Sequence, residues 1–157
     1  MESKALSIEN RNRTYASLVE NLSQSRKLVY DTIKKLGTVS LDKVCFYLGK
    51  PKNALSGRIT ELKSQFFIKE VGIEKSGCSQ NSVTLYAITT EAERIELINR
   101  RYSELRSEKD ALINDYNLDL SSLSKELLKK ELGKLSKEQK TLEIMLEAIN
   151  MLEVIYI

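Results

Sequence analysis

The residues best suited to chemistry lie on one predicted helix in the middle of the chain, from residue 51 to 66. Its apolar residues Leu55, Ile59, Leu62 and Phe66 recur at helical spacing and would face a core. Small polar and basic residues lie on or near the opposite side: Lys52, Asn53, Ser56, Gly57, Thr60 and Lys63. Such side chains hydrogen-bond base edges or neutralise phosphates, so the pattern predicts a DNA-binding face. At 1.5 Å per residue the helix spans roughly 24 Å, enough to lie along a DNA groove.

Three residues of this helix do not fit the simple pattern. Arg58 lies at the edge of the apolar stripe, where it could reach a phosphate. Glu61 is acidic, and we expect it to point sideways towards a basic partner. Gly57 weakens a helix by about 1 kcal/mol relative to alanine. We therefore expect its missing side chain to permit close approach of a duplex or of another helix.

The composition argues against an enzyme. The chain has no histidine, which excludes Ser-His-Asp and Cys-His nucleophiles and any His-ligated metal site. Its two cysteines, Cys45 and Cys78, are too few for a four-thiolate zinc site. No glycine-rich phosphate loop occurs, and the carboxylates along 91–115 read as a solvated helix face. We expect no catalytic residue, cofactor or metal.

No apolar run approaches the ~20 residues needed to cross a bilayer. The N-terminal run MESKALSIENRNR also lacks the apolar core of a secretory signal. The sequence therefore predicts no membrane partner and a cytoplasmic location, in the host cytoplasm if the protein is phage-encoded.

The elements around this helix indicate how it is held. A helix from about 25 to 36 has Ser25 as its expected N-cap and ends at Gly37. A two-residue bridge or strand and a helix over 41–48, ended by Gly49, follow. After residue 66, FIKEVGIEK and SVTLYAIT read as two strands around a polar turn, with Val71 and Ile73 on one face. Three helices followed by a two-stranded ribbon are the layout of a winged helix-turn-helix domain.

The charge is distributed unevenly along the chain. Residues 22–90 contain 11 basic and 5 acidic residues, a net charge of +6. Residues 91–157 contain 11 basic and 14 acidic residues, so the total of +3 conceals a basic middle and an acidic end. This division favours nucleic acid as the partner of the middle stretch.

The middle stretch resembles the winged-helix domains of MarR-like regulators and of small phage and mobile-element proteins. The resemblance covers about residues 25–92 and is carried by NALSGRITEL, residues 53–62. It implies that 51–66 is the recognition helix and that 75–81 is the wing, which adds Lys75, Gln80 and Asn81 to the DNA-binding candidates. The chain departs from the family pattern after the recognition helix, where Gln65-Phe66-Phe67 replaces the usual glycine.

The C-terminal stretch reads as helices with heptad-like apolar spacing, interrupted by Lys109 and Gln139. We expect a turn within 115–124, a short helix over 123–132 ending at Gly133, and a last helix opened by a capping box at Ser136. The helices could pack within one chain or between chains, and we favour an oligomer. Its predicted contacts are Ile95, Ile98, Tyr102, Leu105, Leu112, Leu142, Met145, Ile149 and Leu152.

The sequence therefore predicts a mainly α fold with a small β-hairpin. An N-terminal arm or short helix (1–24) precedes a winged helix-turn-helix domain (25–92) and a coiled-coil-like oligomerisation region (93–157). The leading hypothesis is a sequence-specific regulator of transcription that binds double-stranded DNA as a homodimer or higher homo-oligomer. The alternative is a phage or mobile-element assembly protein, either a small terminase-like packaging subunit or a scaffold whose winged helix contacts protein.

Overall fold

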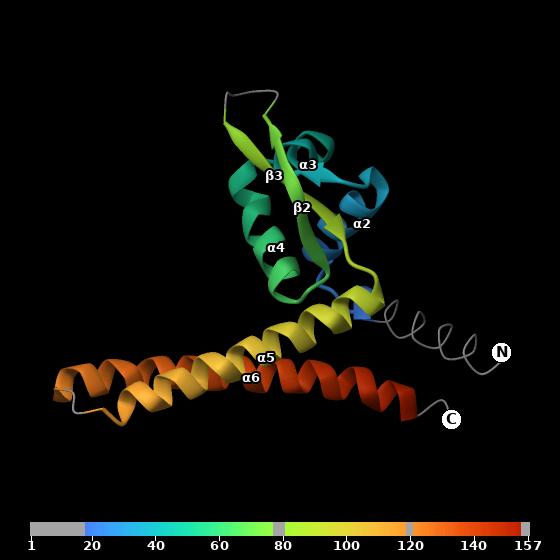
Figure 1. Ribbon diagram of the computed structural model, residues 1–157. Coiled ribbons are helices and arrows are strands. Elements are labelled where there is room, and N and C mark those ends of the chain that lie inside the picture. The colour runs from blue at the N-terminus through green and yellow to red at the C-terminus, as the bar shows by residue number, and fades with distance from the viewer. Residues whose placement is uncertain (1–17, 77–80, 119–120, 155–157) are drawn as a thin grey trace. The chain divides into compact units, whose positions relative to one another are not determined.

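The computed structural model describes residues 18–76, 81–118 and 121–154, with side chains as far as residue 149. The chain divides into two compact units, Met1–Arg94 and Ile95–Ile157. The fold is mainly helical with a small antiparallel sheet (Figure 1), as the sequence predicts. Most of the expected N-terminal helix lies outside the described residues, but Leu18, Val19 and Leu22 pack with the core of the first unit.

The first unit is a winged helix. Its elements are α2 (Gln24–Leu36), β1 (Val39–Ser40), α3 (Leu41–Leu48), α4 (Lys52–Ser64), β2 (Ile68–Lys75) and β3 (Ser82–Ile88). The strands form an antiparallel sheet in the order β1-β3-β2, in which Val39 pairs with Tyr86 and Ile68 with Ile88. The bridge expected before α3 is thus a third strand, which attaches the β2–β3 hairpin to the helices. We call this whole hairpin the wing.

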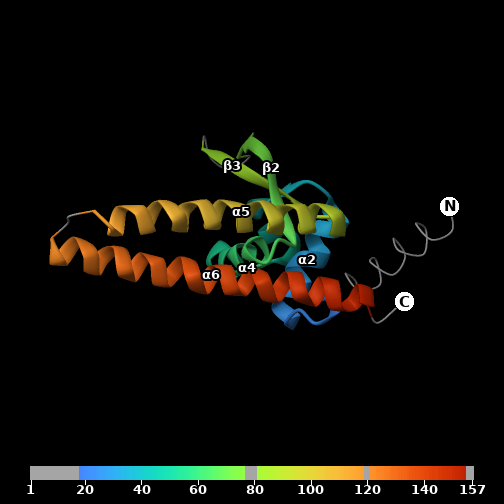
Figure 2. The same ribbon diagram turned by 60° about the horizontal axis from the view of Figure 1, so that its bottom comes forward.

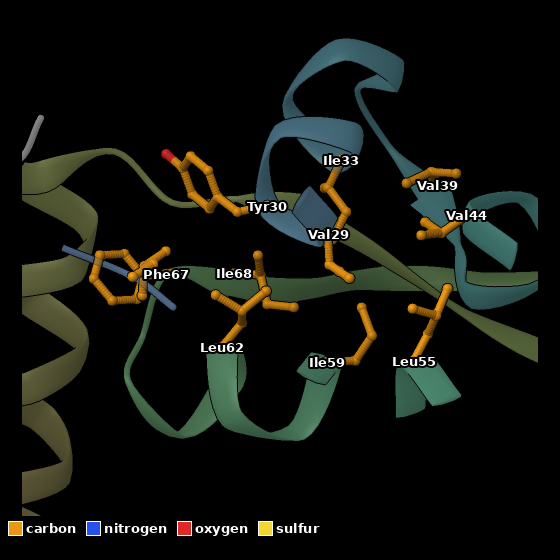
Figure 3. Close-up of a cluster of buried hydrophobic side chains, with 11 residues drawn as sticks. Val29, Tyr30, Ile33, Val39, Val44, Leu55, Ile59, Leu62, Phe67 and Ile68 are labelled. Carbon is orange, nitrogen blue, oxygen red and sulfur yellow. The ribbon is translucent and has the colours of Figure 1, made fainter. Parts of the chain in front are cut away.

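The core of the first unit lies between the helices and the base of the hairpin (Figure 3). The apolar stripe of α4 supplies Leu55, Ile59 and Leu62 to this core, which confirms three of the four predicted positions. The fourth, Phe66, lies beyond the end of the helix and is only half-buried. Tyr30 of α2 meets Phe67 edge to face, with ring centroids 6.1 Å apart. Burial of this stripe fixes which side of α4 is left for solvent.

The C-terminal ends of α2 and α3 lie where the sequence predicts them, but the N-terminal end of α2 does not. Gly37 and Gly49 both adopt positive φ, +77° and +61°, and end their helices as predicted. The N-cap of α2 is Ser23, so the assignment to Ser25 is wrong by two residues. Ser25 lies inside the first turn, whereas the hydroxyl of Ser23 accepts a 2.9 Å bond from Arg26 Nε.

The chain turns sharply after α4 at Phe66, a position near which the family pattern predicts a glycine. α4 ends at Ser64, two residues before the predicted end, and Phe66 adopts φ +59°. This left-handed conformation costs an L-residue about 1–2 kcal/mol. It is held by Phe67 N–H, which donates to Leu62 O at 2.9 Å, and by the Thr89 hydroxyl, which donates to Phe66 O at 2.5 Å. The sharp turn into the wing is therefore made without glycine.

A β-bulge between Glu70 and Gly72 changes the faces of β2. Glu70 pairs with Tyr86 and Ile73 with Thr84, so Glu70 and Ile73 share one face of the hairpin. The simple alternation that put Val71 and Ile73 on one face does not hold across the bulge. Ile73 is 73% exposed although it belongs to a strand.

The second unit is formed by α5 (Glu91–Tyr116) and α6 (Ser122–Val154). α5 ends and α6 begins within the interval predicted for a turn, 115–124. α5 begins in the first unit with a capping box, in which Thr90 N–H donates to Glu93 and Glu93 N–H to Thr90. The predicted break at Gly133 and the predicted start of a new helix at Ser136 are wrong, because α6 continues through both residues. One glycine costs a helix about 1 kcal/mol, which the strong helix formers around it outweigh.

α5 and α6 lie side by side within one chain (Figures 1 and 2). Arg101 Nε donates to Glu138 at 2.9 Å, and Lys109 Nζ donates to Gln139 Oε1 at 2.6 Å. Tyr102 OH donates to Glu143 at 3.0 Å. The two polar interruptions of the apolar stripe therefore pair with each other, which fixes the register of an intrachain hairpin.

Candidate nucleic-acid interface

The outer side of α4 is exposed along its length. Leu55, Ile59 and Leu62 turn inward, and the remaining polar residues are left for solvent. We call this the α4 surface, and its exposed members are Lys52, Asn53, Ser56, Gly57, Thr60 and Lys63. Arg58 is half-buried at its edge. The structure thus brings together the residues that the sequence singled out on this helix.

The three cations of α4 are each paired with a carboxylate of the same unit. Lys52 Nζ lies 2.7 Å from Asp42 Oδ1, a carboxylate of α3. Lys63 pairs with Glu70 of β2, at the other end of the helix. Arg58 Nη1 donates to both oxygens of Glu61, at 2.6 and 2.7 Å. The α4 surface is therefore less positive than its sequence suggests.

Glu61 lies beside two arginines, which confirms the prediction that it points towards a basic partner. Besides Arg58, it lies 3.6 Å from Arg26 Nε of α2. These contacts place its charge at the side of α4. Arg58 can contact a phosphate only by competing with this carboxylate.

Asp42 connects three elements at the N-terminal end of α4. It pairs with Lys52, and the hydroxyl of Ser76, at the end of β2, donates to its other oxygen at 3.4 Å. The hydrogen bond with Asp42 raises the pKa of Lys52 above its ordinary value. A cavity of about 220 Å³ beside this pair is also lined by Thr84 and Tyr86 of β3. The wing is thus fixed against the start of α4.

The wing carries a second tie to α3 and one cation without a described ion pair. Lys43 Nζ lies 2.9 Å from Glu74, which lowers the pKa of that carboxyl below its ordinary range. Lys75 is exposed and opposite Ser82 in the hairpin. Asn81 is exposed, and its carbonyl accepts the Ser76 N–H at 2.9 Å. Gln80, the remaining wing candidate, lies outside the described residues.

Sequence reasoning missed three residues at this site. Lys50 is exposed in the turn before α4, and its place between Gly49 and Pro51 could have drawn attention to it. Asp42 and Glu70 come from α3 and β2, and no sequence spacing links them to α4. Their importance follows only from the tertiary structure.

Gly57 is not required for packing against any described part of the chain. A Cβ built on it would meet nothing within 4 Å, and its backbone is helical. The alternative that two helices meet here is therefore excluded for the described residues. Close approach of a partner is the remaining expectation.

Replacing Gly57 by alanine should consequently separate stability from binding. The variant is expected to gain about 0.5–1 kcal/mol in free energy of unfolding, because alanine favours the helix. It is expected to lose affinity for DNA if the duplex approaches the backbone at this point. Urea unfolding and a binding titration of the same preparation measure both effects. Unchanged affinity would remove Gly57 from the interface.

The described residues hold no group of three or more histidine, cysteine or acidic side chains that could bind a metal. Burial raises the pKa of the Cys45 thiol, as suits a small half-buried apolar residue in α3. None of the helices in the described part of the chain combines the length and apolar character needed to cross a membrane.

The predicted oligomerisation residues fall into two groups. Ile98, Leu105, Leu142 and Ile149 are buried in the single chain. Ile95, Tyr102, Leu112 and Met145 are half-buried, and the side chain of Leu152 lies outside the described set. Large apolar side chains are instead exposed around the turn between α5 and α6: Ile113, Tyr116, Leu118, Leu123 and Leu127.

The chain matches no protein-family model and no curated protein. Solved structures that it resembles include a cysteine-to-serine mutant of Lactococcus lactis ZitR, with a TM-score of 0.34 and 17% identity over 75% of each chain. A ZitR mutant with a cysteine and a histidine changed to alanine, in its apo form, gives a TM-score of 0.33 and 18% identity, over 85% of this chain and 96% of that one. A crystal structure described as a transcriptional regulator gives a TM-score of 0.36 and 12% identity, over 96% and 99%.

Proposed function

We propose that the protein binds double-stranded DNA in a sequence-specific manner and regulates transcription as a homo-oligomer. The observation that carries the proposal is the α4 surface, an exposed row of small polar and basic side chains beside a wing. The 13 residues of α4 give a length of about 20 Å, which suits the major groove. The first unit of the chain carries a net charge of +5 and the second unit −2.

The residues divide by chemistry into those that read bases and those that contact phosphates. Asn53, Ser56 and Thr60 are short and exposed, so they suit hydrogen bonds to base edges. Lys50 and Lys75 flank the helix from the preceding turn and the wing, and neither forms an ion pair with a described residue. They would contact phosphates on either side of the groove, while the wing residues Gln80 and Asn81 approach the backbone.

We further propose that a second copy associates through the second unit. The facing sides of α5 and α6 already bury apolar residues and pair polar side chains with each other. A second copy would therefore contact the outer side of the two helices. Leu123 and Leu127, one helical turn apart, are 66% and 60% exposed. Burying this surface against its equivalent in a second chain would present two α4 helices to a two-fold DNA site.

One observation favours the second candidate, an assembly or packaging protein that uses the winged helix for protein contacts. Phe46 on α3 is 92% exposed, and Ile73 of the wing is also uncovered. Large exposed apolar side chains often mark protein interfaces. Size-exclusion chromatography with light scattering distinguishes the two, because a dimer suits a regulator and a ring of many subunits suits packaging.

Selection of bound fragments from random DNA at physiological salt tests the proposed function. We expect a palindromic site whose affinity falls steeply with salt, because phosphate contacts release counterions.

Changing Arg58 and Lys63 to alanine should weaken binding about tenfold or more and flatten the salt dependence. The matched control changes Lys34 and Lys140, two exposed lysines without a described ion pair, to alanine. Equal affinities for the two variants would contradict the assignment of the surface.

A further inference from the structure

We propose that Asp42 and Glu70 compete with DNA phosphates for Lys52 and Lys63, and so lower the affinity of the protein for DNA. The proposal rests on the proposed function. It adds two acidic residues to an interface described so far by its polar and basic members.

The two carboxylates hold the two ends of α4. Lys52 is the first residue of the helix and Lys63 the last but one. Their partners come from different elements, Asp42 from α3 and Glu70 from β2. A cation at either end can therefore reach a phosphate only by leaving a carboxylate that stays beside the contact.

Nearly all the acidic residues of the basic stretch form ion pairs with lysine or arginine. Residues 22–90 contain five carboxylates, and four of them pair with cations: Asp42, Glu61, Glu70 and Glu74. The fifth, Asp31, is exposed on α2 with no ion pair to a described residue. The pairing is thus concentrated on α4 and the wing, where phosphates would approach.

The strength of these pairs suits competition with phosphate. Lys52 and Asp42 keep 60% and 31% of their side-chain surface in solvent, and Lys63 and Glu70 keep 44% and 49%. Exposed pairs of this kind shift an equilibrium by a factor of about five at most. A phosphate can therefore displace each carboxylate, but the exchange weakens binding.

This competition lowers the affinity for any duplex whose phosphates Lys52 and Lys63 contact. Non-specific binding depends essentially on phosphate contacts, so it carries the cost of releasing the lysines. At a specific site, base contacts from Asn53, Ser56 and Thr60 supply additional affinity but do not change that cost. The carboxylates thus lower the affinities for random and specific DNA by about the same factor.

The test compares two variants of equal net charge. In the first, Asp42→Asn and Glu70→Gln remove both carboxylates while keeping their oxygen acceptors, including the one that accepts from Ser76. In the control, Asp31→Asn and Glu20→Gln remove two exposed carboxylates that form no ion pair with described residues. Fluorescence anisotropy measures binding of each to a labelled random-sequence duplex and to the selected site, and thermal melting confirms that both fold.

We expect the first variant to bind both the random duplex and the selected site about 5- to 30-fold more tightly than the control does. Adding Lys52→Gln and Lys63→Gln should abolish the gain, because the released lysines produce it. Equal affinities of the two charge-matched variants would overturn the inference, as would a gain that persists without the lysines. If the wild-type protein binds and the variants do not differ, only this inference fails. If no variant binds DNA, the proposed function fails with it.

Discussion

Replacing Leu62 by alanine is expected to lower the free energy of unfolding of the winged helix by about 3 kcal/mol. Leu62 of α4 is 0% exposed and belongs to the core cluster, where Figure 3 shows it near Ile68 of β2. Alanine removes three carbon atoms and leaves a cavity whose close-packed walls relax only partly. For a unit of this size, the loss corresponds to a fall in Tm of at least about 12 °C. Urea unfolding followed by circular dichroism measures it.

Leu28→Ala is the matched control, because Leu28 lies on α2 but is 40% exposed. The same chemical change should cost clearly less at Leu28, since 40% of its surface already contacts water and less surface is buried on folding. Comparable losses at both positions would show that α4 does not pack as described. The Leu62 variant should also lose DNA affinity, because the core orients the α4 surface.

Changing Leu123 and Leu127 to aspartate is expected to convert the proposed oligomer into monomers. Two charges in the middle of an apolar contact would lose their hydration without gaining partners. The monomer should bind a two-fold site about 100-fold more weakly, because the second α4 helix no longer benefits from tethering to the first. Light scattering gives the mass, and titration with the selected duplex gives the affinity.

The control for this experiment adds the same charge elsewhere on α6. Ser136→Asp and Thr141→Asp alter two exposed polar residues, so they should leave both mass and affinity close to those of the wild type. If the leucine variant keeps the wild-type mass, the turn end of the hairpin is not the contact. If the wild type is itself a monomer, the oligomeric part of the proposed function is wrong.

The helices of the winged unit could be predicted from the sequence because each carries a local signal. Gly37 and Gly49 end α2 and α3, and the apolar stripe of α4 sets its buried face. Two predictions from glycine positions were wrong or incomplete, because helix propensity or tertiary hydrogen bonds contributed more free energy there. Gly133 does not interrupt α6, because flanking residues with high helix propensity outweigh a single glycine. Phe66 makes the turn after α4 without glycine, because tertiary hydrogen bonds hold its backbone in place.

The C-terminal stripe shows a different limit. Heptad-like spacing requires an apolar partner for each helix but does not say which chain supplies it. The pairing of Lys109 with Gln139 and of Arg101 with Glu138 answers this for the seam, which closes within one chain. Apolar residues that the stripe did not emphasise, such as Leu123 and Leu127, are consequently those left exposed.

The sequence by itself determined the winged-helix layout, the face of α4 that solvent meets and the sign of the charge around it. All three follow from residue order, because helical periodicity and net charge are properties of the chain. Only the tertiary structure decided how much of that charge is available. Asp42 and Glu70 are distant from their lysines along the chain or on other elements, and folding brings each carboxylate to its cation. Ion pairing depends on distance in space, which composition and spacing do not contain.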